Sequence, residues 1–330
     1  MPAMKSPMPC LFALLFCLVT SLAYAASSPI LQRPYDLDTG SGILRGTLLL
    51  PQTANPPPIA LLVAGSGPTD RDGNNPEGGN NAYLRKLADA LATKGIASLR
   101  YDKRGVAQSR PAAPREEQLS VEGYVADVAA WSHKLADDPR FGRQILVGHS
   151  EGVLIASLAA PASRADAFIA IAGSARPIDA VLREQLQARL PTPMLAQALP
   201  LIAQLKAGQL QPQVPPELQV LFRPSVQPYL VSLFRQDPAS AFAALKIPTL
   251  ILQGTRDIQV DVADAEALKR AKPDAELHLI AGMNHILRIA PTSIAQHLAS
   301  YNDPNLPLAQ ELIQHMTAFI QQVAALPPAS

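Results

Sequence analysis

The sequence predicts an α/β fold in which a mostly parallel sheet is flanked by helices and interrupted by a helical insertion. Three observations support this prediction. Short apolar runs alternate with longer helical stretches up to residue 173, the alternation stops over residues 174–245, and it resumes from residue 246. Continuous apolar strands separated by helices are typical of a parallel sheet covered on both faces.

The N-terminal segment has the composition of a secretory signal. Lys5 precedes an apolar run over residues 10–19, and Ala23-Tyr24-Ala25 follows as a small-x-small cleavage triplet. A membrane anchor is the alternative, but the run is shorter than the roughly 20 residues of a spanning helix. We therefore expect residues 1–25 to be removed, leaving an exported, periplasmic or secreted protein with no stable membrane anchor.

Composition excludes several classes of partner and site. The 28 basic and 27 acidic residues nearly cancel and form no long block of one sign, so the chain lacks the electrostatic signature of nucleic-acid binding. Both cysteines, Cys10 and Cys17, fall inside the predicted signal. The mature chain then has no disulfide, cysteine nucleophile or thiolate metal site. The oligomeric state stays open.

The pattern of each segment predicts its secondary structure. Residues 34–37 and 43–51, separated by a turn-rich cluster, predict a hairpin. The later strands are predicted at residues 59–63, 96–101, 144–147, 167–172, 248–253 and 276–280. Helices of the core are predicted at residues 81–94, 121–136, 150–159, 262–271 and 307–325.

Residues 174–245 contain helical patches at 178–189 and 194–209 and no clear buried strand. A segment of this length is not an ordinary loop. We expect a helical cap over the strand ends, inserted before the strand that precedes the acid residue and dividing the core into residues 26–173 and 246–330. A separate helical domain beside the sheet is the alternative.

Gly148-His149-Ser150-Glu151-Gly152 lies between an apolar strand and a helix-like stretch. A serine in a tight strand-to-helix turn is held in a strained conformation that exposes its hydroxyl. The helix N-terminus directs unpaired N–H groups and partial positive charge to the same place. Ser150 is therefore the predicted nucleophile.

A serine nucleophile needs a base, and the base needs a carboxylate that orients it. His285 follows the last predicted strand, and Asp257 follows the strand before it, so both lie after Ser150 in the order Ser, acid, His. Asp261 and Asp264 compete with Asp257 but resemble helix-capping residues. The remaining histidines fall in helices, in a strand or within the motif: His133, His149, His278, His297 and His315.

A glycine-rich turn, Gly65-Ser66-Gly67-Pro68, follows the strand at residues 59–63. Such a turn lets the backbone approach a substrate closely. We assign the oxyanion donors to the backbone N–H groups of Ser66 and Glu151; a simple tight turn is the alternative for residues 65–68. The predicted chemistry requires no metal and no organic cofactor.

Together these residues resemble the α/β-hydrolase superfamily over nearly all of the mature chain. Residues 100–109 resemble the Asp-x-Arg-Gly-x-Gly-x-Ser loop of that superfamily, with Ala107 where glycine is usual. The segment from Gly65 to Gly73 is similar to the Ser-Gly-Pro-x-Asp-Arg-Asp-Gly segment of bacterial carboxylesterases of the EstD type. Within that segment the role of Asp70, Arg71 and Asp72 stays open between bracing the loop, lining the entrance and a solvated loop.

The resemblance implies an α/β-hydrolase fold with a helical cap, serine ester hydrolysis and a small-molecule ester as substrate, with short acyl esters as test substrates. Three alternatives remain at this stage. A serine peptidase or amidase and an acyltransferase would use the same three residues, and a noncatalytic binding protein could share the fold.

Overall fold

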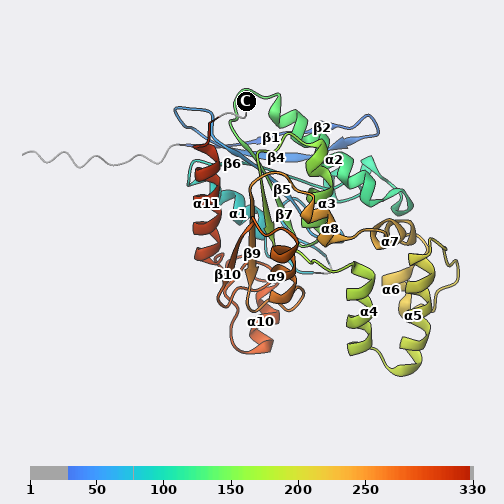
Figure 1. Ribbon diagram of the computed structural model, residues 1–330. Coiled ribbons are helices and arrows are strands. Elements are labelled where there is room, and N and C mark those ends of the chain that lie inside the picture. The colour runs from blue at the N-terminus through green and yellow to red at the C-terminus, as the bar shows by residue number, and fades with distance from the viewer. Residues whose placement is uncertain (1–28, 77, 328–330) are drawn as a thin grey trace, which may run out of the picture.

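The structure is a computed structural model that describes residues 29–76 and 78–327. The predicted signal, residues 1–25, lies outside the described residues. An eight-stranded sheet forms the centre, in the order β1-β4-β6-β5-β7-β8-β9-β10 (Figure 1). β4 pairs antiparallel with β1 and β6, and every other neighbouring pair is parallel. The predicted fold class is confirmed.

The strands of this sheet are β1 Ile30–Pro34, β4 Gly46–Pro51, β5 Ile59–Val63, β6 Ala97–Tyr101, β7 Gln144–His149, β8 Ala167–Ile171, β9 Thr249–Gly254 and β10 Glu276–Ile280. β2 Leu37–Asp38 and β3 Ile43–Leu44 form a separate two-stranded ladder. The N-terminal hairpin is thus present, and its main ladder begins at Ile30, before the predicted start, because Ile30 pairs with Pro51.

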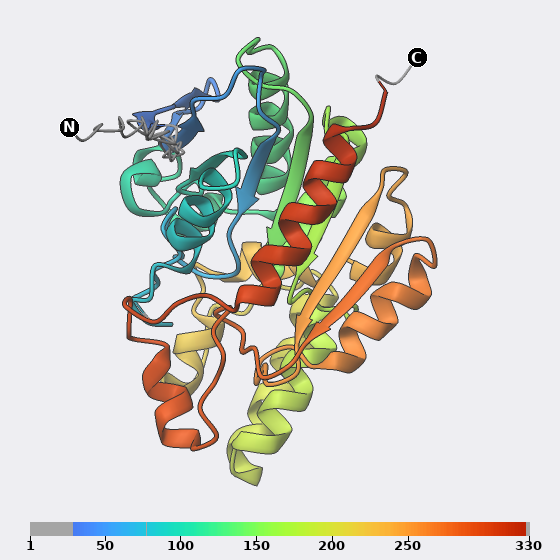
Figure 2. The same cartoon turned by 90° about the vertical axis from the view of Figure 1, so that its left-hand side faces the viewer.

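Helices cover both faces of the sheet. α1 Tyr83–Ala92 and α11 Gln310–Ala324 lie on one face, where Figure 2 shows α11 crossing in front of the strands. α2 Val121–Ala136, α3 Glu151–Ala159, α8 Pro238–Ala243 and α9 Val262–Ala271 pack on the other face. Successive residues of β5 alternate between the two apolar clusters, which explains why this strand is apolar throughout.

The insertion contains α4 Ile178–Arg189, α5 Thr192–Lys206, α6 Gln219–Phe222 and α7 Gln227–Phe234. These helices share an apolar cluster of their own, apart from the two clusters of the sheet. Figure 1 shows these helices grouped together at the lower right, and in the chain they follow β8. α8, although it lies within residues 174–245, packs against α3 and α9 of the core. The predicted domain limits stay a prediction.

Outside residues 174–245, one α-helix of the described residues was not predicted. α10 Ile294–Ser300 lies in the segment that joins β10 to α11. It is short, and most of its side chains are exposed, so it lacks the apolar periodicity that marks a longer helix.

Asp70, Arg71 and Asp72 brace the loop that follows β5. Arg71 forms an ion pair with Asp102 at 2.6 Å, and its backbone N–H donates to the same carboxylate at 2.8 Å. Asp72 pairs with Arg100 at 2.9 Å. Asp70 accepts the backbone N–H groups of Asp72 and of Asn74. Of the alternatives for these three residues, the contacts favour bracing.

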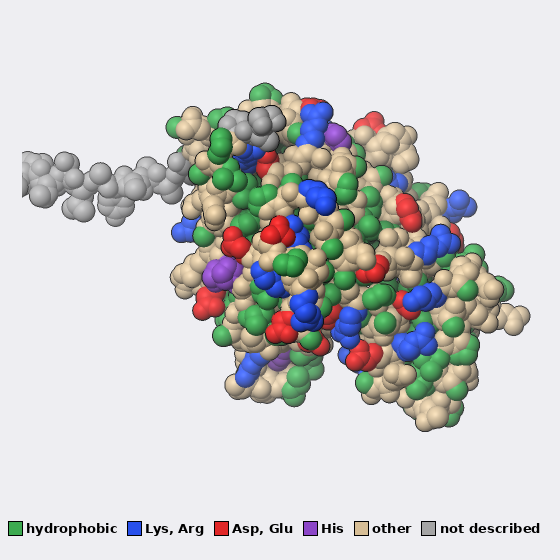
Figure 3. Space-filling view, viewed as in Figure 1, with side chains coloured by type: hydrophobic (Ala, Val, Ile, Leu, Met, Phe, Trp, Pro, Cys, Tyr) green, Lys and Arg blue, Asp and Glu red, His purple; other side chains and the backbone are tan. Residues whose placement is uncertain are grey.

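The surface carries both signs of charge. Figure 3 shows basic and acidic side chains interspersed on one face. In the described residues, no helix is both long and apolar enough to cross a membrane.

Ala107, which stands where the resembled loop has glycine, has a φ of +42°. Replacing Ala107 by glycine should raise the free energy of unfolding by about 0.5–1 kcal/mol, because relief of left-handed strain exceeds the added chain entropy. Urea unfolding followed by circular dichroism measures the change. Ala90→Gly, in α1, is the control and should lower stability by about 1 kcal/mol. A destabilised Ala107→Gly variant would contradict this account.

Candidate active site

Ser150 occupies the turn between β7 and α3. Its φ of +55° and ψ of −125° lie outside the conformations usual for a residue with a side chain. Its backbone N–H donates to the carbonyl of Ile171, at the end of β8, at 2.9 Å. The turn is therefore strained and anchored to the neighbouring strand, the backbone geometry predicted for an exposed serine hydroxyl.

The glycines on either side of this turn are required by close backbone contact. A Cβ on Gly148 would lie 2.5 Å from the carbonyl oxygen of Gly152. A Cβ on Gly152 would lie 2.3 Å from the carbonyl oxygen of Val63, at the end of β5. Any side chain at either position would push α3 away from the strands. The two glycines of the motif are therefore required for packing, in addition to the chemical role of Ser150.

His285 and Asp257 form a buried pair. The imidazole Nδ1 and the carboxylate Oδ2 are 2.7 Å apart. The other oxygen of Asp257 accepts the N–H groups of Gln259 at 2.7 Å and Val260 at 3.0 Å. Burial raises the pKa of Asp257, but the His285 ring and these backbone N–H groups outweigh it, so the pKa is lowered. The carboxylate is thereby kept ionised beside the ring that it orients.

The two competing aspartates have other partners. Asp261 is the N-cap of α9 and accepts the N–H of Asp264. Asp264 is buried and pairs with Arg176 at 2.9 Å, which joins α9 to the start of the insertion. Neither is bonded to His285, so the structure brings together His285 and Asp257, as the order along the chain predicts.

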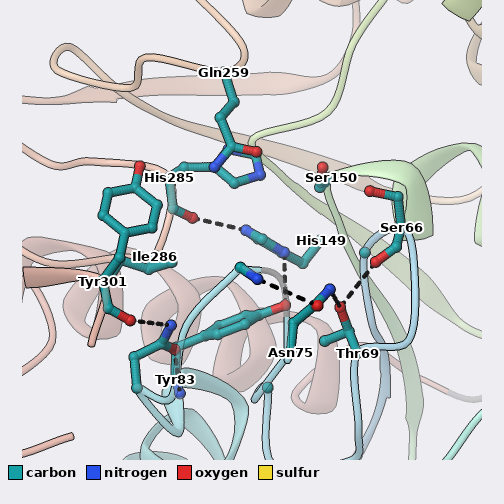
Figure 4. A pocket seen from close by; sticks show the side chains of 14 residues that line it. Ser66, Thr69, Asn75, Tyr83, His149, Ser150, Gln259, His285, Ile286 and Tyr301 are labelled. Carbon is teal, nitrogen blue, oxygen red and sulfur yellow. Dashed lines mark hydrogen bonds between the residues drawn. The ribbon is translucent and has the colours of Figure 1, made fainter. Parts of the chain in front are cut away.

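Ser150 and His285 line the same pocket (Figure 4). The pocket has a cavity volume of about 80 Å³. Its fourteen lining residues are Gly65, Ser66, Thr69, Gly73, Asn75, Gly78, Asn81, Tyr83, His149, Ser150, Gln259, His285, Ile286 and Tyr301. None of these described residues is an aspartate, glutamate, lysine or arginine, so the lining presents no fixed charge to a ligand.

The predicted oxyanion donors, Ser66 and Glu151, flank Ser150. Ser66 lines the pocket, and Glu151 is the first residue of α3. Within the described residues, neither backbone N–H donates a hydrogen bond to another protein group. Two free N–H groups, one at a helix N-terminus, are the arrangement that stabilises negative charge on a substrate oxygen.

His149 is a site residue that was not predicted from the sequence. Its Nε2 lies 2.8 Å from the carbonyl oxygen of His285, and its Nδ1 lies 2.8 Å from the hydroxyl of Tyr83. Because a carbonyl only accepts, Nε2 carries the proton, and the Tyr83 hydroxyl donates to Nδ1. Figure 4 shows both contacts beneath the pocket. His149 therefore holds the backbone of the predicted base.

Burial keeps His149 neutral. Burial, and to a smaller extent the neighbouring His285, lowers the pKa of the ring to about 3. The two rings lie 4.8 Å apart. A neutral His149 can hold the His285 loop without placing a second positive charge beside the imidazolium that forms during catalysis.

Two pocket residues, Tyr83 and Tyr301, come from segments with no functional role predicted from the sequence. Tyr83 begins α1, and Tyr301 directly follows α10. Neither has a recognisable motif, because only the fold brings these positions to Ser150. The other histidines, His133, His278, His297 and His315, are absent from the pocket lining.

The insertion reaches this site from behind. No residue of α4 to α7 is among the described pocket-lining residues. The hydroxyl of Tyr229, in α7, donates to the side chain of Glu151 at 2.5 Å.

The described residues contain no group of three or more His, Cys, Asp or Glu side chains suited to hold a metal ion.

Comparison with known proteins assigns the family. The family model for serine aminopeptidase S33 (Hydrolase_4) matches residues 80–289, more than half of the chain. The chain belongs to this family of serine hydrolases. It is also 31% identical over 251 residues to Esterase EstD of Thermotoga maritima, covering 74% of this chain and 58% of that protein. The chain thus spans less than two thirds of the length of this relative.

Solved structures share the fold of this serine hydrolase. Est1E of Butyrivibrio proteoclasticus superposes with a TM-score of 0.57 at 16% identity, covering 89% of this chain and 99% of that one. A proline iminopeptidase of Mycobacterium smegmatis superposes with a TM-score of 0.56 at 15% identity, covering 88% and 99%. Est1E and the iminopeptidase match almost equally, so the likeness confirms the fold but does not identify the substrate.

The buried, neutral His149 makes the free energy of unfolding depend on pH. The unfolded ring binds a proton below pH 6.5, whereas the folded ring stays neutral down to about pH 3. Its contribution is therefore complete above pH 6.5 and is lost as the pH falls toward 3, by about 1.4 kcal/mol per pH unit. His149→Gln, which has no titrating group, should lose stability less steeply over this range. Urea unfolding at pH 7, 6, 5 and 4.5 measures this; parallel curves for the two proteins would contradict it.

Proposed function

We propose that this serine hydrolase is a carboxylesterase that cleaves small or medium-chain carboxylic esters through an acyl-enzyme on Ser150. The observation that carries the proposal is the uncharged pocket around Ser150 and His285. An ester is neutral, so it can enter such a pocket without leaving a buried charge unpaired. The name of the EstD relative supports the same reaction.

Each step of the proposed reaction uses a group in the pocket or directly behind it. Ser150 Oγ attacks the ester carbonyl carbon while His285 takes the hydroxyl proton, and Asp257 stabilises the resulting imidazolium. The N–H groups of Ser66 and Glu151 bind the oxyanion. The carbon–oxygen bond to the alcohol then breaks, and the alcohol leaves with the proton from His285. Water, deprotonated by His285, hydrolyses the acyl-enzyme and restores Ser150.

An aminopeptidase reaction, which the family description includes, makes a different demand on the pocket. The free α-amino group of a peptide is positively charged and requires a carboxylate close to the scissile bond. The two nearby carboxylates already have partners: Asp257 holds His285, and Glu151 accepts from Tyr229. The described lining therefore favours a neutral ester over a peptide with a free amine.

The size of the pocket supports a short acyl group. Its volume of about 80 Å³ is well below the roughly 300–1,000 Å³ of sites for drug-sized ligands. We expect p-nitrophenyl acetate and butyrate to be hydrolysed about tenfold or more faster than the octanoate ester, measured as kcat/KM. Aminoacyl p-nitroanilides should be cleaved slowly or not at all.

Ser150→Ala should lower kcat for p-nitrophenyl butyrate by about 10⁴–10⁶-fold and abolish labelling by a fluorophosphonate probe. Ser157→Ala is the matched control, because Ser157 is a buried serine of α3, the helix that Ser150 precedes, and its hydroxyl has no partner in the described residues. Faster cleavage of aminoacyl anilides than of esters would favour the peptidase. Equal labelling of wild type and Ser150→Ala would refute the assigned nucleophile.

A further inference from the structure

Lys103 is buried directly behind the predicted oxyanion hole. It follows β6 in the loop that contains Asp102, and only 3% of its surface is exposed. Its ammonium group donates a short hydrogen bond to the backbone carbonyl of Gly65. The same group lies 5.4 Å from the centre of the Tyr124 ring. A lysine is rarely buried so completely, because its charge loses the hydration of water.

The bond to Gly65 controls the direction of a neighbouring N–H. The carbonyl of Gly65 and the N–H of Ser66 belong to one planar peptide unit, and the described residues contain no cis peptide bond. In a trans peptide the C=O and N–H point in opposite directions. A cation that holds the Gly65 carbonyl on the buried side therefore directs the Ser66 N–H toward the pocket, which Ser66 lines.

The cation also strengthens this donor. Positive charge at a carbonyl oxygen draws electron density from the peptide, so its N–H becomes a better donor to an anion. The N–H of Ser66 donates to no other group in the described part of the chain. Its hydrogen-bonding capacity is thus available for the substrate oxygen.

Glu151 connects Lys103 to the second donor. The negative charge of its side chain stabilises the Lys103 ammonium, partly offsetting the lowering of the Lys103 pKa by burial. The backbone N–H of Glu151 is the other predicted oxyanion donor. The Tyr229 hydroxyl, from α7, holds this carboxylate at 2.5 Å. Lys103 thus contacts the peptide of one donor and acts electrostatically on the residue of the other, whose side chain is held by Tyr229 of the insertion.

We propose that Lys103 is the positioning residue of the oxyanion hole: by holding the Gly65 carbonyl, it orients and polarises the Ser66 N–H for the transition state. This inference rests on the proposed esterase function. Lys103 does not line the pocket, so it acts through the peptide and not by contact with substrate. Its removal should affect the transition state more than substrate binding.

Lys103→Met keeps the aliphatic chain and removes the donor and the charge. We expect kcat for p-nitrophenyl butyrate to fall about 10–100-fold, with KM changed less than about threefold. This fall in kcat is smaller than the fall caused by removing a whole oxyanion donor. A trifluoromethyl ketone, which forms a tetrahedral adduct with Ser150, should bind more weakly by the same factor as kcat/KM falls. Lys103→Gln, which retains a neutral donor, should recover part of both losses.

Lys272→Met is the matched control. Lys272 is a second buried lysine, 5% exposed, that donates to the backbone carbonyl of Leu245 at 3.1 Å, away from the pocket. The Lys272→Met variant should have a lower free energy of unfolding in urea but the same kcat as wild type. If Lys103→Met fails to fold, Lys103→Gln and Tyr229→Phe, compared with wild type for ketone affinity and kcat, provide the same test.

The outcomes separate this inference from the function on which it rests. A wild-type protein that neither hydrolyses esters nor reacts with fluorophosphonate would refute the proposed function. An active wild type, with folded Lys103 variants that keep its kcat and ketone affinity within about twofold, would overturn the role of Lys103 alone. Equal kcat losses in Lys103→Met and Lys272→Met would also overturn it, because a general loss of stability would then explain both.

Discussion

The backbone turn at Ser150 is the constraint on which the rest of the site depends. Its positive φ is sustained because Gly148 and Gly152 let β7, α3 and the end of β5 approach to backbone contact. Such strain persists only where the surrounding packing compensates for it. The same close approach places Gly65 against Ser150, where an added Cβ would lie 3.1 Å from that of the serine. The contact that exposes the nucleophile therefore also places the oxyanion loop beside it.

The charged groups of the site lie behind its peptide groups. Asp257 is behind His285, Lys103 is behind the Gly65–Ser66 peptide, and Asp102 holds the loop after β5 through Arg71. The pocket itself is lined by uncharged side chains and backbone. In a buried environment fixed dipoles act strongly on a developing charge, and they need no rearrangement when the reaction occurs. This arrangement suits a neutral substrate that becomes anionic only in the transition state.

Substrate choice in this serine hydrolase depends on segments outside the sheet. The pocket walls come mainly from the loop after β5, the start of α1 and the segment around α10. The sheet that supports them is shared with Est1E and with a proline iminopeptidase. Loops carried on a rigid scaffold can change specificity without changing the fold. Here the insertion contacts the site from behind, through the hydrogen bond from Tyr229 of α7 to Glu151.

Elements with local causes can be predicted from the sequence alone. The strands, the main helices of the core and the turn at Ser150 could be predicted, because apolar periodicity and glycine spacing act between near neighbours. Asp257 and His285 could be placed because parallel strands end at one edge of a sheet. The positions of His149 and Lys103 in the site, by contrast, follow from tertiary packing. Their partners, His285 and Gly65, are 136 and 38 residues away in the chain, and such contacts exist only once strands and loops have packed together.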